Sequence, residues 1–192
     1  MIITGAGRRY NAGVDSTNRL LTRSVARSDN VDAGLRDEAF FLITPVIELT
    51  SANPSLLWLF QNDEDRDLIV TSAAIASGPS TGGTTDSFEV NRIAGVDLVA
   101  TGGAGVPMPV ASKIVGSNRT LANTSELGQE GASLTTGTLD SPQFARTGET
   151  TDNGIFLILP KGTQFGEVVT PPAGNTSMRV TVLLECYLRE AL

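Results

Sequence analysis

The side chains that could carry out chemistry are concentrated in one acidic segment. Asp63, Glu64, Asp65 and Asp67 fall within five residues. Such a cluster could bind a hard cation such as Ca²⁺, and two carboxylates about 5–10 Å apart could hydrolyse a glycosidic bond. The segment lacks the glycine and the terminal glutamate of an EF-hand loop, and four acidic residues also form a well-hydrated turn. We therefore predict a turn between two strands and no metal site.

The composition excludes several classes of catalytic site. The chain has no histidine, so it cannot build a Ser-His-Asp or Cys-His site or a histidine-based zinc site. Cys186 is its only cysteine, which excludes an intrachain disulfide and a cysteine zinc cluster. The glycines at 5 and 7 and at 102–105 do not continue into a phosphate-binding motif. We expect no enzymatic activity, no cofactor and no metal.

The charge balance also narrows the choice of partners. The chain has 14 basic and 21 acidic residues, which gives a net charge of −7 at pH 7. An acidic chain does not attract nucleic acid or anionic lipid. The longest apolar runs, such as 39–43 and 56–60, are five residues, against about 20 for a spanning helix. The start of the chain also lacks the apolar core of a signal peptide. We expect neither nucleic acid nor a membrane as a partner.

The clearest structural signal is the alternation of apolar and polar residues in 178–188, which predicts a strand with one buried face. The residues expected to face the core are Met178, Val180, Val182, Leu184, Cys186 and Leu188. Cys186 should therefore pack as a small apolar side chain rather than react. Trp58, inside an apolar run, is expected in the same core.

Further short apolar segments predict more strands. In 41–49 the residues Phe41, Ile43, Ile47 and Leu49 should share one face, with the strand at an edge or broken at Pro45. Segments 56–61 and 68–75 should form a hairpin around the acidic turn. The remaining candidates are 87–94, 108–115, 154–159 and 164–170, whereas 118–151, rich in Ser, Thr and Gly, should be a long surface loop. The fold expected is all-β, an antiparallel β-sandwich of the jelly-roll type, formed by 39–192.

Residues 1–38 lack this alternation and are expected to form an extended N-terminal arm. They hold six of the 12 arginines and five acidic residues, so the arm is near +1, whereas 39–192 carries −8. Arginine and tyrosine are enriched where proteins contact one another. We expect the arm to anchor the protein to a partner; the alternative is a terminus that touches nothing. The contact residues expected are Arg8, Arg9, Tyr10, Arg19 and Arg23.

Several turn-forming motifs lie between the expected strands. Leu-Pro-Lys-Gly at 159–162 and Pro-Pro-Ala-Gly-Asn at 171–175 preset tight connections. Together with the segments 14–20, 41–51, 56–70, 101–110 and 117–119, these motifs resemble small structural proteins of tailed bacteriophage virions. The most similar group is the head decoration, or cement, proteins, with a jelly-roll body that is typically trimeric on the capsid exterior.

That resemblance implies a function based on protein contacts. It predicts a homotrimer that binds the major capsid protein on the outside of the head and stabilises the shell. It supplies no catalytic residues. Two alternatives stay open: a tail, fibre or baseplate component with the same kind of body, and a carbohydrate-binding module.

Overall fold

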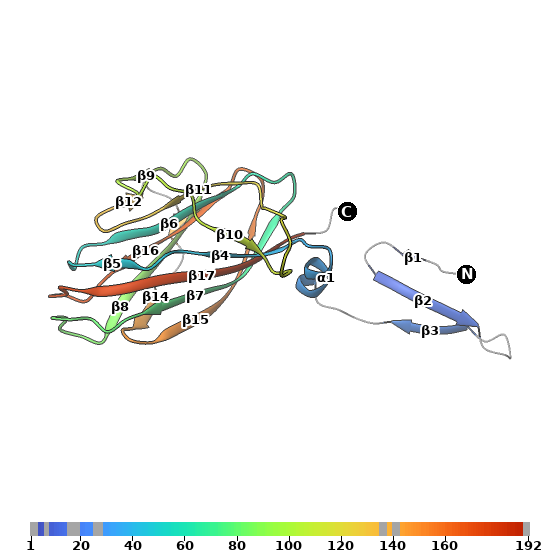
Figure 1. Cartoon of the computed structure of the whole chain (residues 1–192), viewed down its shortest axis with the longest axis horizontal. Helices are drawn as coiled ribbons and strands as arrows, with labels where there is room; N and C mark the ends of the chain where they lie inside the picture. The colour runs from blue at the N-terminus through green and yellow to red at the C-terminus, as the bar shows by residue number, and fades with distance from the viewer. Residues whose placement is uncertain are drawn as a thin grey trace.

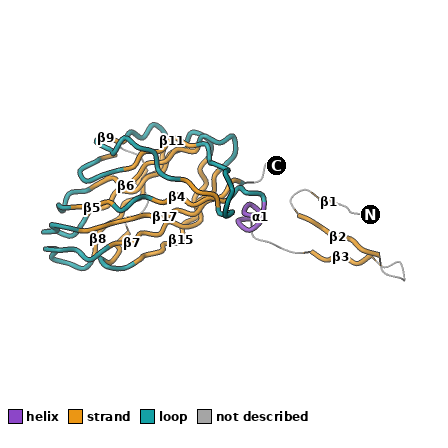
Figure 2. The backbone as a smooth tube through the Cα atoms, in the orientation of Figure 1, coloured by secondary structure: helices purple, strands orange, loops and turns teal. Residues whose placement is uncertain are grey.

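The computed structural model describes residues 4–5, 8–14, 20–24, 29–134, 138–139 and 143–189. Within them the chain forms two antiparallel sheets packed face to face, one short helix, and a separate N-terminal sheet (Figure 1). Strands dominate the backbone, and the helix α1 (Asp29–Leu35) lies at one end of the sandwich (Figure 2). The expected all-β sandwich is confirmed.

The first sheet has the strand order β10-β4-β17-β7-β15, and β5 also pairs with β17. Its strands are β4 (Ala39–Ile43), β5 (Ile47–Leu49), β7 (Leu68–Ser77), β10 (Val110–Ser112), β15 (Thr150–Leu159) and β17 (Met178–Leu188). The central strand β17 has the predicted bounds. All six residues expected to face the core, Cys186 among them, are buried.

The second sheet has the order β11-β6-β16-β8-β13, and β14 also pairs with β8. Its strands are β6 (Ser55–Asn62), β8 (Ser87–Gly95), β11 (Asn123–Leu127), β13 (Thr138–Leu139), β14 (Gln143–Arg146) and β16 (Gln164–Thr170). A two-stranded ribbon of β9 (Ala100–Thr101) and β12 (Ser133–Leu134) accompanies them. Trp58 lies in the core between the sheets, as predicted, and packs edge-on against Phe165 with ring centroids 5.1 Å apart.

The predicted hairpin around the acidic turn is wrong. β6 pairs with β11 and β16 in the second sheet, whereas β7 pairs with β15 and β17 in the first. The acidic segment therefore crosses from one sheet to the other. Both strands find their partners far along the chain, so the turn residues between them could not reveal the pairing.

The predicted shared face of 41–49 is also wrong. In β4 the residues that face the core are Phe40 and Leu42, Ala39 is buried beneath α1, and Ile43 is 47% exposed. Opposite β17, Ile43 pairs with Leu183 but Ile47 pairs with Val180, so residues 44–46 contain one extra residue. Such a bulge moves the side chains that follow to the other face of the sheet.

The segment 118–151, expected to be a loop, instead contains short strands at the edges of the sheets. β11 pairs with β6, and β14 pairs with β8. Most residues of β11 are polar because that edge strand has little buried surface, so its sequence carries no apolar alternation.

Candidate interaction surface

Four of the five expected anchor residues lie in a small N-terminal sheet. It consists of β1 (Thr4–Gly5), β2 (Arg8–Val14) and β3 (Leu20–Ser24), and none of these strands pairs with the sandwich. Arg8, Arg9 and Tyr10 begin β2, where Tyr10 pairs with Ser24. Arg23 on β3 pairs with Asn11, so Tyr10 and Arg23 lie at neighbouring register positions on opposite faces of the hairpin. Arg19 lies outside the described residues.

The helix α1 joins this sheet to the sandwich and covers one end of the first sheet's outer face. Ala33 is fully buried and packs with Ala39, Ile69 and Tyr187. Residues 29–38 were expected to be part of the extended arm, but they lie against the sandwich. The small side chain of Ala33 allows the helix to lie close to the sheet. Beneath it, Tyr187 on β17 pairs with Ala39 on β4 and with Ile69 on β7.

A cluster of charges fixes the chain where α1 leads into β4. Arg66 donates to both carboxylate oxygens of Glu38, at 2.6 and 3.0 Å, and Arg36 Nε donates to the same group at 2.7 Å. Arg66 also donates to the carbonyl oxygen of Arg189 at 2.8 Å. These guanidinium groups lower the pKa of Glu38 from 4.5 to about 2. The cluster ties the start of β4 to the β6–β7 loop and to the end of β17.

Beyond α1 the outer face of the first sheet is apolar and uncovered within the described part of the chain. We call this the apolar face; it consists of Phe41, Ile43, Val46, Ala74 and Leu183. Leu183 pairs with Ile43 on one side and Ala74 on the other, which places them in one row. Ile43 is 47% exposed and Val46 is 63% exposed. Contiguous exposed apolar surface can mark a contact with another molecule, so this face is a candidate interaction surface.

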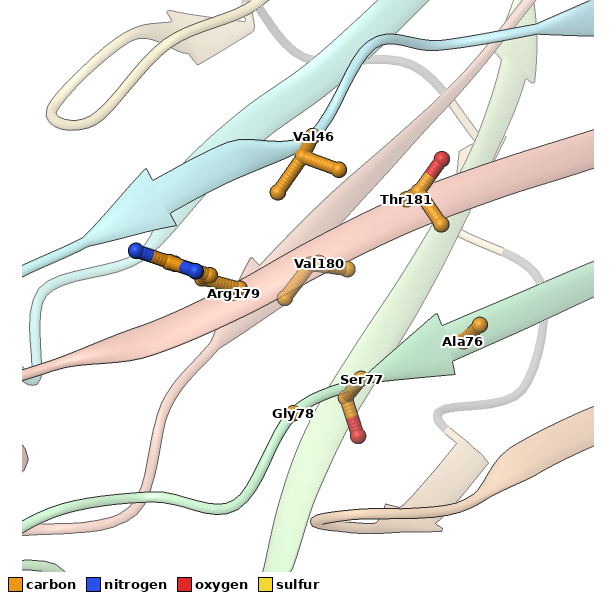
Figure 3. Close-up of a pocket in the computed structure, with 7 residues that line it drawn as sticks. All are labelled: Val46, Ala76, Ser77, Gly78, Arg179, Val180 and Thr181. Atoms are coloured by element: carbon orange, nitrogen blue, oxygen red, sulfur yellow. The ribbon is translucent and has the colours of Figure 1, made fainter.

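The bulge shapes one end of the apolar face. Figure 3 shows Val46 beside Thr181 and Arg179, around a shallow hollow of about 200 Å³ whose floor includes Ala76 and Gly78. At the other end Lys113 lies over the ring of Phe41, 4.7 Å from its centre, and donates to Glu185 at 2.8 Å. The uncovered part is therefore the row of Ile43 and Leu183 together with the hollow at Val46.

The acidic segment is used for structure at four separate points. Its carboxylates accept hydrogen bonds from Thr124 to Asp63 (2.7 Å), from the Ala122 amide to Glu64 (2.8 Å), from Lys161 to Asp65 (2.5 Å) and from Arg189 to Asp67 (3.4 Å). Asp63 and Glu64 thus contact residues 122–124, whereas Asp65 and Asp67 contact Lys161 and Arg189. Over residues 29–134 and 143–189 no group of three or more acidic or cysteine side chains is arranged to hold a metal ion.

A charged cluster in the core was missed by the sequence analysis. Arg92 on β8 and Glu167 on β16 are 1% and 0% exposed, and Nε donates to Oε1 at 2.9 Å. Trp58 donates to the other oxygen of Glu167 at 3.1 Å, and Arg92 donates across the sandwich to the carbonyl of Ala73 at 3.1 Å. Burial raises the pKa of Glu167, while Arg92 and Trp58 oppose that rise. Through the hydrogen bond from Arg92 to Ala73, the cluster connects the second sheet to the first.

A signal for this cluster does exist in the sequence. Arg92 follows Phe88 and Val90 at the same spacing of two, and Glu167 has the same spacing from Phe165 and Val169. Charges at inward positions of two strands suggest a buried pair, because a single buried charge is costly.

The second sheet carries a hollow of its own, of about 400 Å³, on its outer face. Glu89, Asn91, Ile93 and Leu134 are among its lining residues, and Asn91 donates to Glu89 at 2.9 Å. Phe144, 71% exposed, pairs with Glu89 on the adjacent strand. The hollow thus combines a carboxylate and an amide with a nearby exposed aromatic ring.

No helix in the described part of the chain is long and apolar enough to cross a membrane. In comparisons with known proteins, no family model and no curated relative matches this chain.

Proposed function

We propose that the sandwich is a jelly roll. Eight strands pair in a nested order along the chain: β4 with β17, β6 with β16, β7 with β15, and β8 with β14. The first strand thus pairs with the last and the second with the second-last. That is the order obtained when one long hairpin is rolled into two sheets, as in jelly rolls, which occur in viral capsid proteins and lectins.

On this fold we propose a head decoration protein of a tailed bacteriophage. It binds the major capsid protein on the outside of the head as a homotrimer and stabilises the shell through protein contacts alone. The observation that carries this proposal is the nested strand order, joined with the phage-like turn motifs. The apolar face and the arginine-bearing N-terminal hairpin supply surfaces suited to such contacts.

Binding to isolated phage parts tests this function. The heads and tails come from the phage that encodes this protein, grown with the gene inactivated so that its particles lack the protein. Purified protein is mixed with the heads and, separately, with the tails, and the bound protein is measured after sedimentation. We expect saturable binding to heads, in a fixed ratio to the capsid protein. Saturable binding to tails alone would identify a tail component and contradict the proposal.

The arm has its own test in the same assay. Deleting residues 1–12 removes Arg8, Arg9 and Tyr10 but leaves the sandwich and its core complete. We expect the sandwich of the deleted form to stay folded and the protein to bind heads at least tenfold more weakly, about 1.4 kcal/mol. Unchanged binding by the deleted form would show that the arm is not the anchor.

A carbohydrate-binding module is the second candidate, because the hollow on the second sheet fits that role. A sugar needs hydrogen-bonding groups such as Glu89 and Asn91, and an exposed ring such as Phe144 beside them. If this candidate is right, the protein binds sugars on a glycan array and Phe144→Ala abolishes that binding. In the sedimentation assay the protein would then not bind bare heads.

A further inference from the structure

The N-terminal sheet has no second layer of its own. A small sheet of two or three strands is only marginally stable in water unless another surface covers one of its faces. β1, β2 and β3 pair with one another and with no strand of the sandwich. Figure 1 shows β2 and β3 on the far side of α1 from the two large sheets. This sheet therefore needs a surface that its own sandwich does not provide in this arrangement.

The charge of the N-terminal segment is opposite to that of the rest of the chain. Residues 1–28 hold five arginines and one acidic residue, Asp15, a net charge of +4. Residues 29–192 hold nine basic and 20 acidic residues, a net charge of −11. Opposite charge therefore favours contact between this segment and the body of a neighbouring copy.

The apolar face has the matching features. It is flanked by exposed carboxylates: Asp152 on β15 pairs with Ala74 in the central row, and Glu48 lies on β5 beyond the bulge. Asp29 and Asp32 stand on α1 at the other end. Lys113 and Arg179 also border the face, but these four carboxylates outnumber the two cations. An apolar row with more acidic than basic neighbours suits a segment that carries arginines among apolar and aromatic residues.

We infer that the N-terminal hairpin, β2 and β3, of one copy packs on the apolar face of a second copy. The inference rests on the proposed homotrimer and names the surfaces that hold it together. Because the donated and receiving surfaces differ, the contact is heterologous, and in a ring of three each copy gives one hairpin and receives one. In its own copy, α1 already covers one end of that face, where Ala33 packs with Ala39 and Tyr187.

Engineered cysteines test which copy receives the hairpin. The native Cys186 is buried, and burial raises its pKa to about 12, so it does not compete. Chains with Tyr10→Cys and chains with Val46→Cys are mixed, denatured and refolded together, and oxidised. Val96→Cys, in the loop that follows β8 of the second sheet, replaces Val46→Cys as the control, since both valines are 63% exposed. We expect a disulfide-linked dimer of the two variants in a yield at least tenfold above the Val96→Cys control.

Two other results would overturn the inference. One is equal yield with the control. The other is a chain carrying both substitutions, Tyr10→Cys and Val46→Cys, that forms its disulfide within single chains, because the hairpin would then cover its own sandwich. The experiment uses no phage heads, so a failure of the decoration function would leave the expected cross-link unchanged.

A surface variant gives an independent readout. Ile43→Glu places a charge on the apolar face at a half-exposed position, so the fold should persist. We expect light scattering to report loss of the trimer, whereas Thr150→Glu, at the edge of the same sheet, keeps it. A trimer that survives Ile43→Glu with unchanged dissociation would contradict the inference, even if the protein still decorates heads.

Discussion

Replacing Arg92 by methionine should remove a large part of the protein's free energy of unfolding. Arg92 and Glu167 are almost completely buried, and their contact is 2.9 Å. Removing one partner of a buried ion pair costs about 3–5 kcal/mol because the other charge is left without compensation. Arg92→Met also removes the hydrogen bond to the carbonyl of Ala73, which adds about 1 kcal/mol. We expect a loss of about 4–6 kcal/mol at pH 7, against a total of about 5–15 kcal/mol for a domain.

The loss should depend on pH in a defined direction. Burial raises the pKa of Glu167, and without Arg92 the largest opposing influence is gone. A carboxyl whose pKa is higher in the folded state than in the unfolded state destabilises the fold as pH rises above its unfolded pKa, about 4.5. The deficit of Arg92→Met should therefore be largest at pH 7 and shrink toward pH 4.5.

The assay is urea unfolding of the full chain, followed by Trp58 fluorescence at both pH values. Arg179→Met is the matched control, since Arg179 is exposed on β17, and it should change stability by less than about 0.5 kcal/mol. The double variant Arg92→Met, Glu167→Gln should recover about 2 kcal/mol of the loss. A loss below about 1 kcal/mol for Arg92→Met, or one that does not vary with pH, would refute the buried pair.

Three other predictions concern the core, the charge cluster at α1 and assembly. Leu184→Asp places an unpaired charge at a position that is 2% exposed and should cost about 3–5 kcal/mol; an unchanged melting temperature would be inconsistent with the strand register. Glu38→Gln should cost about 2 kcal/mol at pH 7, and the difference from the native chain should close as pH falls from 4.5 to about 2, because the lowered pKa of Glu38 stabilises the fold only while it is ionised. Light scattering at micromolar concentration should report a trimer, and a monomer would count against the assembly.

Strands whose own residues alternate could be predicted well from the sequence. β16 and β17 have the predicted bounds, and the inward residues of β17 were identified one by one. Alternation records burial on one face, and both strands run through the centre of a sheet without a break in that pattern on the buried side.

The remaining features depend on contacts that no local pattern records. The predicted break of the strand 41–49 at Pro45 is confirmed by the bulge at 44–46. Its effect on which residues share a face is defined against β17, more than 130 residues away, and could not be predicted. Whether β6 and β7 pair depends on β16 and β17, which compete for the same edges. The register of the N-terminal sheet, which pairs Arg23 with Asn11, likewise depends on two strands together, and the apolar face depends on the register of β4.

Cryo-electron microscopy of the phage tests the central claim most directly. Particles produced with and without an intact gene for this protein are compared in difference maps of head and tail. A decoration protein predicts extra density on the outer surface of the head, with threefold shape and room for a sandwich of this size. Difference density confined to the tail, or no difference in the particle at all, would contradict it.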